Sequence, residues 1–64
     1  MPDYIVYLFY YRKHSVYYRD TDIETAVEMA KEKAMDVGAR EFMIKAENGH
    51  RRYYRYEHGW RQYR

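Results

Sequence analysis

The sequence predicts an α+β fold in which a single five-stranded, largely antiparallel sheet carries one helix on one face. Three observations lead to this prediction. Two β-branched and aromatic stretches lie before residue 20, a segment with helical periodicity follows, and a glycine-centred motif repeats near the end of the chain. With 64 residues, the chain is expected to form one small domain spanning residues 1–64.

The first two strands are predicted at Tyr4–Tyr11 and Val16–Arg19, joined by a polar turn. Both alternating positions of the first strand are apolar or aromatic, which is typical of a strand covered on both faces. We therefore expect this strand to lie inside the sheet rather than at its edge.

One helix is predicted after this hairpin. Thr21 and Glu24 have the spacing of a capping box, so the helix is expected to begin at Thr21 and to end at Val37. Gly38 is expected in the left-handed position that ends many helices. The stripe predicted to face the sheet is Ile23, Ala26, Val27, Ala30, Ala34 and Val37, and the opposite face carries Glu24, Glu28, Glu32 and Asp36 as solvated surface.

The pattern Glu-x-Gly-x-Arg-x-Tyr occurs at residues 47–53 and again at 57–63. It predicts three strands, Glu41–Ala46, His50–Tyr56 and Trp60–Tyr63, joined by three-residue loops in which Gly49 and Gly59 have positive φ. These loops place Phe42 opposite Tyr54 and Ile44 opposite Arg52. Apolar side chains then share one face, and Arg52, the exception, must extend to the rim.

A right-handed crossover through the helix predicts the element order ββαβββ and the strand order 2-1-3-4-5. One helix covers one face only, so the other face is expected to be uncovered. That face takes one of two alternating sets from the first strand: Tyr4, Val6, Leu8 and Tyr10, or Ile5, Tyr7, Phe9 and Tyr11. We favour the first set, which the hairpin is expected to place beside Tyr17 and Arg19, while the sequence leaves the choice open.

The uncovered face is predicted to be both basic and aromatic. Residues 50–64 hold five arginines against one carboxylate, whereas the helix is acidic. The predicted site residues are Lys45, Arg51, Tyr53, Arg55, Arg61, Tyr63, Tyr17 and Arg19. Arginine contacts phosphate and tyrosine offers a flat stacking surface, so we expect a non-catalytic module that binds single-stranded nucleic acid, RNA or DNA.

Two other interpretations stay open. Tyrosine, tryptophan and arginine are also enriched at protein interfaces, so the face could serve a protein–protein interaction module, either a homodimer or a small inhibitor of a larger protein. The short connections and regular turn chemistry also fit a designed scaffold with no evolved function. Composition alone does not separate these alternatives.

The sequence gives no sign of catalysis, a cofactor or a metal site. It has no cysteine and no glycine-rich phosphate loop, and its three histidines are expected in separate turns or at a strand end. No apolar run approaches the roughly 20 residues of a membrane helix, and the first residues lack the pattern of a signal peptide. We therefore expect a cytoplasmic protein with no membrane partner.

Overall fold

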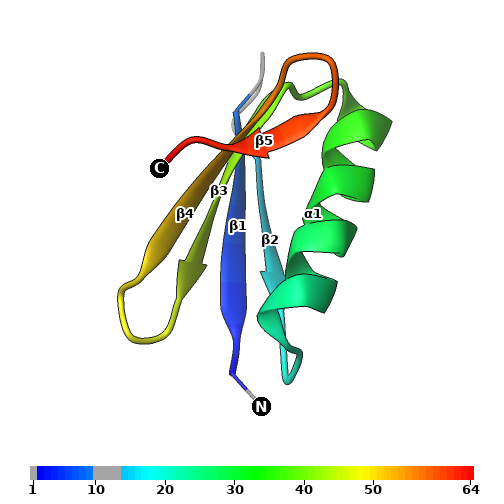
Figure 1. The fold of residues 1–64 in the computed structure, drawn as a ribbon. Coiled ribbons are helices and arrows are strands. Elements are labelled where there is room, and N and C mark those ends of the chain that lie inside the picture. The colour runs from blue at the N-terminus through cyan, green and yellow to red at the C-terminus, as the bar shows by residue number, and fades with distance from the viewer. Residues whose placement is uncertain (1, 10–13) are drawn as a thin grey trace.

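The structure, a computed structural model, describes residues 2–9 and 14–64 of the chain (Figure 1). Its elements are β1 (Tyr4–Phe9), β2 (His14–Tyr18), α1 (Ile23–Val37), β3 (Glu41–Ala46), β4 (Arg51–Tyr56) and β5 (Trp60–Gln62). The strands form one sheet in the order β2-β1-β3-β4-β5, and each neighbouring pair is antiparallel. The predicted fold class and strand order are confirmed. The last two residues of the first predicted strand, Tyr10 and Tyr11, lie outside the described residues.

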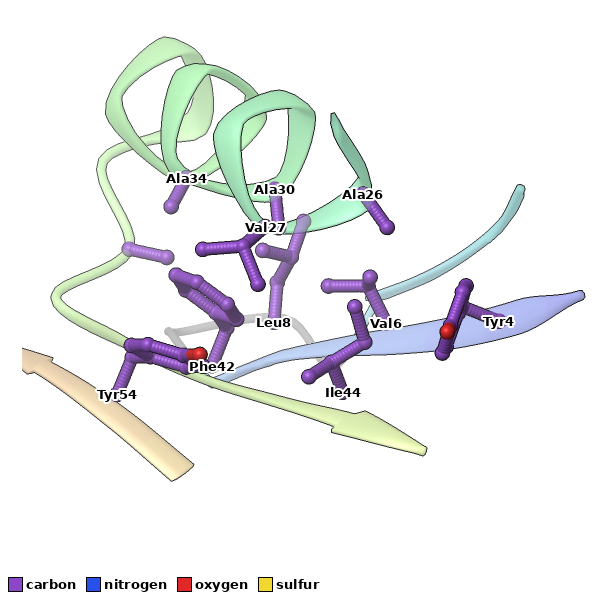
Figure 2. Packing of buried hydrophobic residues seen from close by; sticks show 11 residues of the cluster. Tyr4, Val6, Leu8, Ala26, Val27, Ala30, Ala34, Phe42, Ile44 and Tyr54 are labelled. Atoms are coloured by element: carbon purple, nitrogen blue, oxygen red, sulfur yellow. The ribbon is translucent and has the colours of Figure 1, made fainter. Parts of the chain in front are cut away.

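The helix packs against one face of the sheet through an alanine-rich stripe (Figure 2). Ala26, Ala30 and Ala34 have no exposed surface, which lets the helix backbone lie close to the strands. The large side chains come from the sheet: Val6, Leu8, Phe42 and Ile44 are almost fully buried. Burial of these apolar side chains is the main favourable contribution to folding, so the predicted stripe on α1 is confirmed as the helix side of the core.

The cap at the start of the helix differs from the prediction. Asp22, not Thr21, is the N-cap residue, and its carboxylate accepts a hydrogen bond of 2.7 Å from the Thr25 backbone N–H. Thr21 instead donates its own N–H to the Pro2 carbonyl, at 3.1 Å. An ionised carboxylate is a stronger acceptor than a hydroxyl and also suits the positive end of the helix dipole, which explains why the capping residue lies one position later than predicted.

The other end of the helix and the first of the two glycine turns are as predicted, whereas the second turn differs because His58 also has a positive φ, of 59°. Gly38 has φ of 82° and ends the helix, while Gly49 and Gly59 have φ of 91° and 123°. Phe42 pairs with Tyr54, as predicted from these loops. The strand boundaries shift by a residue or two: β2 begins before and ends before the predicted range, β4 begins one residue later, and β5 ends one residue earlier.

The preferred choice of face for the first strand is wrong. Tyr4, Val6 and Leu8 are buried under the helix, so Ile5, Tyr7 and Phe9 occupy the uncovered face. The cause is the pairing of β1 with β3, which places Val6 opposite Ile44 and Leu8 opposite Phe42. Directly opposed residues in an antiparallel pair share a face, so the buried side of β3 fixes the buried side of β1.

In the described part of the chain, the helix α1 is not long and apolar enough to cross a membrane.

Candidate binding face of the sheet

The face of the sheet away from α1, here called the open face, consists of alternating residues from all five strands. By register it holds Ser15 and Tyr17 of β2, Ile5, Tyr7 and Phe9 of β1, Glu41, Met43 and Lys45 of β3, Arg51, Tyr53 and Arg55 of β4, and Arg61 of β5 followed by Tyr63. Arg19, just beyond β2, lies over the Tyr17 ring with its guanidinium carbon 5.4 Å from the ring centroid. The eight residues singled out from the sequence therefore share one face.

Strand pairing arranges these side chains in three rows across the sheet. The middle row ends in the polar Ser15 of β2, which pairs with Tyr7. Its other members are Tyr7, Met43, Tyr53 and Tyr63, because Tyr7 pairs with Met43, Met43 pairs with Tyr53, and the Tyr63 N–H donates to the Tyr53 carbonyl. Neighbouring strands lie about 4.8 Å apart, so the four residues cover roughly 14 Å. Three of these four side chains are aromatic, so the register gives the open face a largely aromatic strip.

The rows on either side of this strip carry the charge. One flanking row runs through Tyr17, Ile5, Lys45 and Arg51, and the other through Phe9, Glu41, Arg55 and Arg61. Within residues 2–9 and 14–64, Lys45, Arg51 and Arg61 form no ion pair with a carboxylate. These three cations are therefore available to an anionic partner.

Arg55 is held by its neighbours. Its Nε lies 2.8 Å from Glu41 Oε1, and a second nitrogen is 3.7 Å from the Glu57 carboxylate. The hydrogen bond with Glu41 raises the pKa of Arg55 above its ordinary value. The guanidinium also lies over the Tyr63 ring, 4.5 Å from its centroid, and the Tyr63 hydroxyl donates to Glu41 at 3.3 Å. Arg55 thus orients Tyr63 and is a poorer phosphate ligand than the other open-face cations.

Tyr53 of β4 packs against Tyr63 near the end of the chain. The ring centroids of Tyr53 and Tyr63 are 6.0 Å apart and the planes are inclined by 51°. The guanidinium carbon of Arg64 lies 5.2 Å from the Tyr53 centroid, a cation–π contact. Tyr63 is 41% exposed and Tyr53 is half-buried, so both rings retain surface that a flat ligand could cover.

A separate network fixes the tyrosine at the β2 edge. The Tyr17 hydroxyl donates to one oxygen of the Asp3 carboxylate at 2.9 Å, and the Asp20 backbone N–H donates to the other at 2.9 Å. These hydrogen bonds, first from Asp20 and then from Tyr17, lower the pKa of Asp3, and the bond with Asp3 raises the pKa of Tyr17. The Tyr17 ring is consequently held at the edge of the open face.

The sequence prediction of the face missed six residues, one of which is the small polar Ser15 of β2. Ile5, Tyr7 and Phe9 were assigned to the core side, although their alternation with Val6 and Leu8 marked them as the other candidate set. Met43 and Glu41 follow from the same alternation in β3, since they flank the buried Phe42. Glu41 matters most, because it places a carboxylate among the cations.

The described residues offer no metal site: among them no group of three or more histidine, cysteine, aspartate or glutamate side chains is arranged to hold an ion. Comparisons with protein-family models, with curated proteins and with solved structures found no match to this chain.

Proposed function

We propose that the open face binds single-stranded nucleic acid. The observation that carries this proposal is the aromatic middle row, Tyr7, Met43, Tyr53 and Tyr63, placed between flanking rows that hold Lys45, Arg51 and Arg61. Bases have flat apolar faces and the backbone has regularly spaced negative charges, so a strip of rings bordered by cations matches both parts.

The arrangement suits a single strand better than a duplex. Stacking on Tyr53 or Tyr63 needs an unpaired base with a free face, which a base inside a duplex lacks. Contacts from arginine and lysine to phosphate carry no sequence information. We therefore expect binding that depends on salt and shows little preference among base sequences.

A fluorescence-anisotropy titration with short labelled DNA and RNA oligonucleotides tests the proposal. At low salt we expect saturable binding below about 100 µM protein, the weak end of non-specific nucleic-acid affinities. Affinity should fall as salt rises, because each phosphate contact releases counterions. Absence of saturable binding at low salt for both DNA and RNA would reject nucleic acid as the ligand.

Two classes of variant separate stacking from charge. Tyr53→Ala should weaken binding by about 1–3 kcal/mol with an unchanged salt slope, and Tyr53→Phe, which keeps the ring, should bind nearly as well as the parent. Arg51→Gln and Arg61→Gln should instead flatten the salt slope and weaken binding similarly for all sequences. Glu32→Gln, on the exposed helix surface, is the control and should change neither quantity.

A protein partner is the second candidate, and one observation favours it. The open face is more apolar than the alternating arginines and tyrosines of β4 predict, because it also holds Ile5, Tyr7, Phe9 and Met43. Protein interfaces combine such an apolar centre with a polar rim, so the same face could bury itself against a second copy or another protein. Light scattering over a concentration series distinguishes the cases: a dimer that Tyr53→Ala dissociates, with no oligonucleotide binding, would favour the protein partner.

A further inference from the structure

A cavity of about 390 Å³ opens on the helix side of the sheet, where the start of α1 meets the β3–β4 turn. Its volume falls at the lower end of the range typical of small-molecule sites. Apolar side chains form its floor, among them Tyr4 and Ile44, which are 8% and 1% exposed. Ile23, at the first turn of the helix, closes one side.

Arg52 on the rim of this cavity stands against the pattern of its strand. It pairs with Ile44, so it lies on the buried face of β4, two positions before the buried Tyr54. Its side chain is nevertheless exposed, and it forms no ion pair with any carboxylate in residues 2–9 and 14–64. A residue that breaks a local packing rule without a partner points to a role other than stability.

The other polar groups on the rim are also donors. The Asn48 carbonyl oxygen accepts the His50 backbone N–H at 3.0 Å, which leaves the Asn48 amide nitrogen for a ligand. Arg51 and Arg52 line the same cavity, so its rim carries two guanidinium groups beside the Asn48 amide. None of the described residues that line the cavity carries a carboxylate. The rim therefore favours a ligand that brings its own negative charge.

The nearest acidic side chains border a different hollow. Glu24 and Glu28 line a second cavity of about 320 Å³ along the helix, which they share with Arg52 and Tyr54. Arg52 thus lies between an acidic cavity and one without carboxylates. The carboxylates would repel an anion from the cavity lined by Glu24 and Glu28. An anion at Arg52 would therefore lie on the side of Asn48 and His50.

We propose that the cavity beside Arg52 binds an organic anion made of a flat apolar ring system and a phosphate group. The ring would rest against Ile23 and Ala46, the half-buried apolar side chains of the lining, and the phosphate would accept hydrogen bonds from Arg52 and Asn48. A nucleoside monophosphate and the phosphorylated end of a nucleic-acid strand both have this chemistry. The site is on the opposite side of the sheet from the aromatic row and shares one lining residue, Arg51, with the open face, so its test rests on Arg52, which only the helix side carries.

Titration of the whole chain with adenosine monophosphate, followed by amide chemical shifts in nuclear magnetic resonance, tests this proposal. We expect saturable shifts at Ile23, Asn48 and His50, with a dissociation constant of the order of 1 mM. Adenosine and inorganic phosphate, which each supply half of the ligand, should bind about tenfold more weakly or worse. Two oligonucleotides, one without and one with a terminal phosphate, identify the source of the ligand. If only the oligonucleotide with the terminal phosphate shifts these residues, the ligand is a strand end. If adenosine monophosphate shifts them and neither oligonucleotide does, the ligand is a free nucleotide.

Variants decide whether Arg52 is the anion ligand. Arg52→Gln should weaken binding of adenosine monophosphate by about tenfold or more, as expected for loss of a charge-assisted hydrogen bond, whereas Arg40→Gln, at an exposed arginine that lines neither cavity, should leave it unchanged. If Arg52→Gln fails to fold, Arg52→Lys, which keeps the charge but loses the planar fork, should show a partial loss. No saturable shift at the cavity, or unchanged binding in the folded Arg52 variant, would overturn the proposal. Arg52 would then serve to balance Glu24 and Glu28.

Discussion

Replacement of Gly49 by alanine tests the turn that fixes the register of β3 and β4, and with it the composition of the open face. Gly49 has φ of 91°, and an added L-Cβ would have no heavy atom within 4 Å. The substitution therefore creates no clash, and its cost comes only from the backbone conformation. L-residues resist positive φ by about 1 kcal/mol.

The size of this effect on melting follows from the length of the chain. At roughly 2.1 cal/mol/K per residue, the unfolding entropy of 64 residues is about 130 cal/mol/K. A loss of about 1 kcal/mol then lowers the melting temperature by roughly 7 °C. Gly59, with φ of 123°, lies farther from the conformations open to L-residues, so Gly59→Ala should cost more.

Thermal unfolding followed by circular dichroism measures the change, and a chain of this length can be synthesised with a D-residue as the matched control. D-alanine at position 49 adopts positive φ without strain and restricts the unfolded chain, so it should raise the melting temperature slightly. An L-alanine variant as stable as the parent, or a D-alanine variant that is less stable, would contradict the assigned turn and the register built on it.

Three further predictions concern the helix and the N-terminal segment. Asp22→Ala should destabilise the protein more than Thr21→Ala in chemical denaturation, because Asp22 makes the capping bond. Glu32→Lys should stabilise the helix by a few tenths of a kcal/mol by relieving repulsion, and Glu28→Lys by less, because Glu28 already pairs with a lysine at 3.0 Å. Hydrogen bonds lower the pKa of Asp3 and Asp22 below 3.8, so the stability they confer is present above that pH and lost as pH falls through their folded pKa values. When melting temperature is measured over a pH series, the variants Asp3→Asn and Asp22→Asn should lose less stability at acid pH than the parent does.

The features that could be predicted from the sequence are those set by local chemistry. The positions of Gly49 and Gly59 determine the loop type, and loop type determines which side chains of neighbouring strands lie opposite one another. The alanine stripe of α1 likewise follows from helical periodicity alone. Both signals act within a few residues, so they need no knowledge of the remaining fold.

The features that could not be predicted depend on contacts between distant segments. The buried side of β1 is set by its pairing with β3, more than thirty residues away in the chain, and both alternating sets of β1 are apolar enough for the core. The bond between Glu41 and Arg55 likewise needs the register of two strands and the reach of two side chains. The choice between Thr21 and Asp22 as N-cap is local, because two adjacent residues have capping side chains. The Asp22 carboxylate is the stronger acceptor, and the Thr21 N–H bonds to the distant Pro2 carbonyl instead.

The most direct test of binding at the open face is a map of which residues respond to a ligand. In a nuclear magnetic resonance titration with a short unphosphorylated oligothymidylate, we expect the largest amide and aromatic shifts at Tyr7, Met43, Tyr53 and Tyr63. Residues of the helix face, such as Glu28 and Glu32, should stay unchanged. Shifts confined to the helix, or no shifts at low salt, would contradict the assignment of the open face as the nucleic-acid-binding surface.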